Sequence, residues 1–297
     1  MRILAEFIMR GRMQAIMVVA LASAVPMMFW LGAAAASLVL LRRGLNNALS
    51  VIVAGLLPTV VWALNNDPRP LLGLLGALAI AHILRASASW TKVLLASLVL
   101  GVFYAWALGH VFAQPIAELA QELGALMPKM LSGLYEQLSA DEQLHLQGLI
   151  VPVLTGLMAA VLQLLSIISV LLARYWQAVL YNPGGFALEF QRLRLPAVVL
   201  FPLVIGMLFA PSLGIQAAVL TPVCSVPLMF AGLAVVHGLV ARYRLGGFWL
   251  IGMYIGIVLF TQLTYPFLVV LAIVDSVFDF RGLRAQKNDS DAANGER

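Results

Sequence analysis

Long apolar runs separated by short polar segments make up most of this chain. Several of these runs approach the roughly 20 residues that an α-helix needs to cross a membrane. Arg and Lys gather in alternate polar segments, which is the distribution that the positive-inside rule describes. The pattern therefore predicts an all-α fold, a polytopic transmembrane helical bundle. We expect about eight to ten membrane segments, including short or re-entrant helices.

Two apolar runs are too long for one membrane span and somewhat short for two. The number of predicted spans depends on how these runs divide. Met13–Leu41 has basic residues at both ends, so we predict two short helices broken near Pro26 that return the chain to the cytoplasm. Gly246–Phe280 repeats the pattern, with its break expected at Pro266. Two hairpins give about ten crossings, and collapse of either pair into re-entrant helices gives about eight.

The other predicted spans follow the same hydropathy pattern. They are Asn46–Leu64, Leu71–Leu84, Val93–Phe112, Ile150–Leu172, Ala197–Ala210 and Ile215–Ala241. Together with the two long runs they form one predicted transmembrane domain, residues 1–284. Residues 285–297 are polar and are predicted to be a disordered cytoplasmic tail.

Residues 114–148 differ in character from the spans around them. Five acidic residues against Lys129 give a net charge of −4, which favours the outer face. Apolar residues recur at helical spacing, so we predict amphipathic helices along the interface, interrupted at Pro128. Ser139 and Glu142 have the spacing of a capping box at the start of the next span. The segment is interpreted as a solvated loop helix or as a lid over a substrate.

Composition limits the class of protein. Apolar residues make up 62% of the chain and charged residues 10%, with a mean hydropathy of +0.98; soluble domains carry about a quarter charged residues. The lipid bilayer is therefore a partner. The net charge of +5 is spread in small clusters, so nucleic acid is not expected. The single Cys224 lies in an apolar run, which excludes disulfides and a cysteine metal site.

A basic polar segment, residues 174–196, separates two sets of spans and is interpreted as a cytoplasmic hinge. Pro183 forces Asn182 out of helical geometry, Gly184 or Gly185 allows the turn, and a short amphipathic helix follows at the inner headgroup level. The hinge is predicted to dock a membrane or cytoplasmic partner protein. Its residues are Arg174, Tyr181, Asn182, Pro183, Gly184, Gly185, Phe186, Glu189, Phe190, Arg192 and Arg194.

Three segments carry a family resemblance: RYWQ…YNPGGF…LRLP in the hinge, LLRRG after the first hydrophobic pair, and DSVFDFR at Asp275–Arg281. They resemble the YybS-like family of bacterial integral membrane proteins, whose function is unknown. The resemblance implies a bacterial inner-membrane location. By distant analogy it implies kinship with the substrate-binding subunits of energy-coupling-factor vitamin transporters. The family has no agreed catalytic residues, so it implies none here.

Polar side chains inside apolar runs are the candidates for a ligand pathway, because such residues are costly in hydrocarbon. They are Gln163, His237, Gln262 and Asp275. The two glutamines could instead form hydrogen bonds between helices, and Asp279 is expected to pair with Arg281 or Arg284. No His, Asp or Glu pair has metal-ligand spacing, so neither a metal nor a cofactor is expected.

Small residues four apart allow helices to approach closely. Such pairs are Ala20 and Ala24, Gly32 and Ala36, and Gly252 and Gly256. They could dock a partner, as the first helix does in vitamin-transporter subunits by the resemblance, or could pack inside the protein.

Three function classes follow. The first is a non-enzymatic protein of the bacterial inner membrane, with both termini cytoplasmic, that binds or transports a small molecule with a partner. The second is an assembly or scaffold protein that docks partners through residues 174–196. The third, a lipid-modifying enzyme using Asp275 and Asp279, is disfavoured because no nucleophile, metal site or catalytic motif accompanies them.

Overall fold

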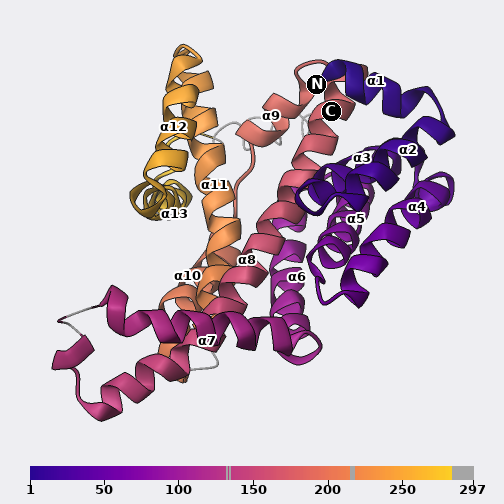
Figure 1. The fold of residues 1–297 in the computed structure, drawn as a ribbon. Helices are drawn as coiled ribbons and strands as arrows, with labels where there is room; N and C mark the ends of the chain where they lie inside the picture. Colours follow the sequence, from indigo (N-terminus) through magenta and orange to yellow (C-terminus); the bar gives the residue numbers. More distant parts are fainter. Residues whose placement is uncertain (132, 134, 215–217, 283–297) are drawn as a thin grey trace. The chain divides into compact units, whose positions relative to one another are not determined.

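A computed structural model describes residues 1–131, 133, 135–214 and 218–282 (Figure 1). Every regular element in these ranges is a helix, which confirms the all-α prediction. The α-helices are α1 (Arg2–Arg10), α2 (Arg12–Ala24), α3 (Phe29–Arg43), α4 (Leu45–Leu64), α5 (Arg69–Ser87), α6 (Trp90–His110), α7 (Ala113–Met130), α8 (Ala140–Tyr181), α9 (Gly185–Gln191), α10 (Ala197–Phe209), α11 (Leu220–Arg242), α12 (Phe248–Leu259) and α13 (Thr261–Phe278). Short 3-10 turns are η1 (Pro26–Met28), η2 (Tyr135–Gln137) and η3 (Ala210–Leu213).

Within the described ranges, six helices are long and apolar enough to cross a membrane: α4, α5, α6, α8, α11 and α13. Three shorter apolar helices, α2, α10 and α12, accompany them. The chain is therefore a multi-pass membrane protein. The predicted tail, residues 285–297, and Arg284 lie outside the described residues.

The first long apolar run divides as predicted. α2 ends at Ala24, η1 follows at Pro26, and α3 begins at Phe29. The carbonyl oxygen of Val25 accepts a 3.0 Å hydrogen bond from the Met28 amide, so the proline starts a tight turn that needs no amide donor from it. The break near Pro26 is confirmed.

The other two predicted proline breaks are wrong in position. α13 runs through Pro266, and the helix break lies at Phe260, with φ −128° and ψ 43°. α7 likewise runs through Pro128 to Met130. A proline removes one backbone donor and bends a helix, but neighbouring helices and side chains in membrane proteins satisfy the freed group, so the helix continues.

The described residues form two compact units, which we call unit 1 and unit 2. Unit 1 comprises residues 1–183 and 205–224, and unit 2 comprises residues 184–204 and 225–282. The first boundary falls between Pro183 and Gly184, inside the predicted hinge. The sequence pattern predicts one transmembrane domain over residues 1–284. In the structure, the contacts between residues concentrate within these two units of it.

α3 is the centre of unit 1, where it packs against α2, α4, α5 and α8 (Figure 1). The run Ala33–Ala36 is at most 1% exposed. A Cβ on Gly32 would lie 2.5 Å from Ser23 Oγ, so the glycine allows α2 and α3 to approach closely. Gly32 thus serves internal packing.

α8 is the longest helix of unit 1. It begins with the predicted capping box, in which Glu142 Oε2 accepts from the Ser139 amide at 2.8 Å and Ser139 Oγ accepts from the Glu142 amide at 3.4 Å. It ends at Tyr181, before Asn182 and Pro183, as predicted. Gly184 then takes φ +85°, a conformation that glycine adopts without strain.

Unit 2 is built from α9, α12, α13 and the parts of α10 and α11 within residues 184–204 and 225–282. α12 packs against α13. α11 meets α13 at Gly232, where an added Cβ would lie 2.0 Å from the carbonyl oxygen of Leu268. The two backbones are therefore nearly in contact at this glycine.

Candidate functional site

Asp275, one of the four ligand-pathway candidates, lies in the last turn of α13 in unit 2 and is 1% exposed. Its Oδ2 accepts hydrogen bonds from the Arg281 guanidinium, at 2.8 Å from Nη2 and 3.2 Å from Nε. Both side chains of this ion pair are at most 3% exposed. A buried carboxylate is tolerated because an opposite charge lies directly against it.

Arg281 also reaches the hinge. Its Nη1 donates to the carbonyl oxygens of Gln191 at 2.9 Å and Leu193 at 2.8 Å. Gly238 of α11 makes room for it, because a Cβ there would lie 2.6 Å from Arg281 Cδ. One guanidinium thus joins the end of α13 to the last residue of α9 and to the segment after it.

Arg194 makes the reciprocal connection from the hinge. Its Nη1 donates to Asp279 Oδ1 at 2.8 Å, and its Nη2 donates to the carbonyl oxygens of Asp275 at 2.9 Å and Ser276 at 3.0 Å. These carbonyls belong to the last turn of α13, where helices have few internal donors; the Asp275 carbonyl also accepts from the Asp279 amide at 2.9 Å. Asp279 therefore pairs with Arg194, a partner not expected from sequence; Arg284, one of the two expected partners, lies outside the described residues.

We call Arg194, Asp275, Asp279 and Arg281 the arginine–aspartate cluster. Its two cations and two anions balance, so it can fix the segment Gln191–Arg194 against the end of α13 without a net charge. Asp275 Oδ1 has no hydrogen-bond partner among the described residues. The cluster joins LRLP in the hinge to DSVFDFR near the end, parts of two of the three segments from which the resemblance was inferred.

The hinge residues of unit 2 divide into a buried group and an exposed group. Phe190 is 7% exposed and packs edge-on against His237, with ring centroids 5.1 Å apart, while Phe186 stacks on Phe190 at 5.9 Å. Arg192 and Gly184 are exposed, Gly185 and Glu189 are half-buried, and Leu188 is 57% exposed. α9 therefore buries one apolar edge and leaves the other open.

The remaining hinge residues belong to unit 1. Tyr181 is 45% exposed and lies beneath the Arg42 guanidinium, 4.0 Å from the ring centroid. Arg174 donates from Nη1 to Gln177 Oε1 at 3.2 Å. Asn182 and Pro183 are exposed.

The candidates on unit 2 do not converge on one pocket. Gln262 is exposed at the start of α13, and 13 residues separate it from Asp275, about 20 Å along the helix. His237 is held by its own helix and by α12, through Nδ1 to the Leu233 carbonyl oxygen at 2.9 Å and Nε2 to Tyr254 Oη at 3.3 Å.

Gln163 lies in unit 1 and is fully buried on α8. Its Nε2 donates to Ser97 Oγ of α6 at 3.2 Å, which is the interhelical hydrogen bond considered from sequence. Its Oε1 has no partner among the described residues, and Gly101 faces it, since a Cβ there would lie 2.5 Å away. One turn on, Ser166 Oγ meets Tyr104 Oη at 2.9 Å. These contacts tie α8 to α6.

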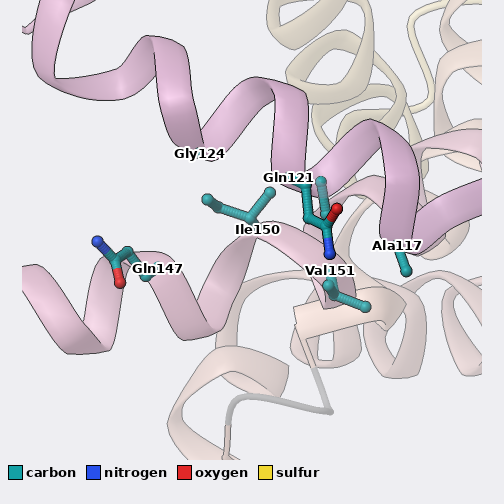
Figure 2. A pocket seen from close by; sticks show the side chains of 7 residues that line it. Ala117, Gln121, Gly124, Gln147, Ile150 and Val151 are labelled. Carbon is teal, nitrogen blue, oxygen red and sulfur yellow. The ribbon is translucent and has the colours of Figure 1, made fainter.

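A hollow that the sequence did not indicate lies between α7 and the first half of α8 in unit 1. It has a volume of about 430 Å³ and is a shallow hollow that is more open than enclosed. Figure 2 shows Gln121 extending from α7 toward α8 and Ile150 extending from α8 toward α7. The lining residues are Ala117, Ala120, Gln121, Gly124, Gln147, Ile150 and Val151.

The small side chains of α7 leave this space open. Small residues at positions 117, 120 and 124 share one face of α7 by helical spacing, and only this spacing could have indicated the hollow. Two amides give it polarity. Gln147 is oriented by a 3.0 Å hydrogen bond from Nε2 to Tyr135 Oη.

A smaller hollow of about 120 Å³ lies at the start of α7. The α4–α5 turn, the end of α6, the start of α7 and Met158 of α8 line it. In that turn, Arg69 donates to both carboxylate oxygens of Asp67, at 2.7 and 2.8 Å. Both hollows are therefore lined by residues 115–124 of α7.

No protein-family model, curated protein or solved structure matches this chain. The YybS-like resemblance therefore stays an expectation. Among the described residues, no group of three or more His, Cys, Asp or Glu side chains is placed to hold a metal ion. Any function must be argued from the sites themselves.

Proposed function

We propose that this chain is a non-enzymatic, multi-pass protein of the bacterial inner membrane that binds a small molecule between α7 and α8 and works with a partner protein. Both termini are proposed to be cytoplasmic, and α7 is proposed to lie at the outer face. In this proposal α7 is the lid considered from sequence, not a solvated loop helix.

The observation that carries the proposal is the hollow of about 430 Å³ beneath α7. Small-molecule sites measure about 300–1,000 Å³ and are mainly apolar with a few polar groups. Ile150, Val151 and the small residues of α7 supply apolar surface, and Gln121 and Gln147 supply donors and acceptors. The amphipathic α7 is joined to the bundle by few buried side chains, Ile116 and Ala120, so it can move to admit a ligand.

Filling the hollow tests the proposal. Gly124→Leu adds a side chain whose Cβ fits, since the nearest atom, Ile150 Cδ1, is 3.5 Å away, and whose branch then occupies the hollow. We expect native mass spectrometry to show a small molecule bound to the wild-type protein and at least tenfold lower occupancy in the variant.

Ala125→Leu is the matched control, because position 125 is the next residue of α7 and is exposed. It should keep the bound molecule. Equal occupancy in Gly124→Leu and Ala125→Leu would contradict this site. Loss of the molecule from Gln163→Ala or Asp275→Ala protein that is shown to be folded, with Gly124→Leu unaffected, would place the ligand at those residues instead.

The alternative, a scaffold protein that docks partners through residues 174–196, has one observation in its favour. The arginine–aspartate cluster holds the backbone of Gln191 and Leu193 while Leu188 and Arg192 stay exposed. A fixed, exposed corner is suited to recognition because little order is lost on binding. Leu188→Asp should then release a co-purifying protein from detergent-solubilised membranes without changing small-molecule occupancy. Loss of the small molecule together with the protein would favour the binding subunit.

A further inference from the structure

The corner between α11 and α12 in unit 2 carries a basic and aromatic sequence, RYRLGGFW, at residues 242–249. α11 ends there in a Schellman motif. The Leu245 amide donates to the Val240 carbonyl oxygen at 2.9 Å, and the Arg244 amide donates to the Ala241 carbonyl oxygen at 3.2 Å. The corner therefore has a defined backbone.

Arg244 occupies the left-handed position of this motif, with φ +52°. Glycine is the residue that usually fills this position, because a Cβ is unfavourable there. Two glycines follow within three residues, at 246 and 247, yet neither occupies the strained position. The backbone alone does not explain an arginine here, so its charge must be considered.

The positive charge of the corner has no acidic counterpart nearby in the chain. Residues 190–274 contain no Asp or Glu. The acids on either side of this stretch have partners of their own: Asp275 and Asp279 pair with Arg281 and Arg194, and Glu189 is not free. Arg242 donates from Nη1 to the Phe280 carbonyl oxygen at 2.5 Å. Within the described ranges, neither Arg242 nor Arg244 forms an ion pair, and both are exposed.

Exposed rings lie close to these two arginines in the sequence. Tyr243 and Phe248 are each 65% exposed and Trp249 is 55% exposed. Aromatic side chains of this kind gather at membrane–water interfaces, where a ring meets both headgroups and acyl chains. An apolar stripe continues along α12 from the corner, through Ile251 at 63% and Ile255 at 53% exposed.

We propose that the α11–α12 corner binds the headgroup phosphate of an anionic phospholipid. Arg242 and Arg244 supply the positive charge and the guanidinium donors for the phosphate. The rings lie at the headgroup level, and the stripe of α12 lies along an acyl chain. A soluble anion would use the arginines but not this stripe, so the lipid is the occupant that fits the whole surface.

The test uses the full chain, purified in detergent and stripped of lipid. The melting temperature is measured after addition of phosphatidylglycerol, phosphatidylcholine or glycerol phosphate. We expect phosphatidylglycerol alone to raise it by several degrees. Arg244→Gly should lose at least half of that rise while folding at least as well without lipid, because glycine removes the strain at φ +52°.

Arg2→Gln is the control, since Arg2 is an exposed residue of α1 in unit 1 and the change removes the same charge. It should keep the full response to phosphatidylglycerol. An equal response to phosphatidylcholine, an equal response to glycerol phosphate, or an unchanged response in Arg244→Gly would each overturn the proposal. So would an equal loss of response in Arg2→Gln, which would indicate a general effect of net charge.

Discussion

Asp275 and Arg281 show how a charge is stabilised in an otherwise apolar chain. Their side chains are at most 3% exposed, and the guanidinium is shared between the carboxylate and two backbone carbonyls of the hinge. An exposed pair such as Arg2–Glu6, with side chains 72% and 41% exposed, remains solvated. The same 2.8 Å separation therefore has different energetic consequences at the two sites.

Removing one partner of the buried pair should destabilise the protein strongly. Asp275→Ala leaves the Arg281 guanidinium buried without its counter-charge, so we expect a loss of about 3–5 kcal/mol in the free energy of unfolding. Denaturant unfolding in detergent, followed by circular dichroism, measures this loss.

Glu6→Ala is the comparison for that experiment. It breaks an exposed pair of equal length, and its effect should stay within about 0.5 kcal/mol. A small effect of Asp275→Ala, similar to that of Glu6→Ala, would show that the arginine–aspartate cluster does not hold the hinge to α13.

At the scale of helices, small residues matter only where a second backbone meets them. Gly252 and Gly256 have the small-residue spacing, yet an added Cβ on Gly252 would meet nothing within 4 Å. Ala20 and Ala24 also lie off the face of α2 that packs inward, which is Ala15, Val19 and Ser23. Gly232, which belongs to none of the motifs considered, is the glycine at which α11 meets α13.

Two alanine substitutions in unit 2 separate these cases. Gly232→Ala places a methyl group against the Leu268 carbonyl oxygen, 2.0 Å away before any shift, so we expect a loss of about 1–3 kcal/mol. Gly252→Ala adds only helix propensity and should be neutral or stabilising by up to about 1 kcal/mol. Thermal unfolding in detergent compares them, and equal effects would contradict the close approach of α11 and α13.

At the scale of the whole molecule, α8 is long enough to extend beyond both surfaces of a membrane. Its 42 residues span about 63 Å, roughly twice the hydrocarbon thickness of about 30 Å. The capping box at its start and Tyr181 at its end therefore lie beyond opposite surfaces of a bilayer that α8 crosses. This length supports placing the acidic segment and the hinge on opposite sides of the membrane, as proposed.

Cysteine labelling tests that topology. In a Cys224→Ser background, which removes the only native cysteine, single cysteines at Gln121 and at Leu188 report on α7 and α9. A membrane-impermeant maleimide applied to intact cells should label position 121 and spare position 188, which reacts only after permeabilisation. Labelling of both positions from one side, or in the reverse order, would overturn the topology.

The amino-acid pattern alone was sufficient to predict a membrane protein, its helices and several of the helix ends. Hydropathy and helix-terminating residues act locally, so Pro26, Ser139 with Glu142, and Asn182-Pro183 could be assigned without tertiary contacts. The effects of Pro128 and Pro266 could not be assigned in this way, because whether a proline ends a helix depends on what surrounds the freed carbonyl.

The candidate sites were predictable only in part. Sequence identified Asp275 and Arg194 as unusual residues but could not pair them with partners 6 and 85 positions away. It also missed the hollow beneath α7 and the role of Gly232, since both depend on how closely two helices approach. Local physical chemistry determined which segments are helical and apolar. The tertiary structure decided which charges meet and where space remains, because packing is set by side chains far apart in the chain.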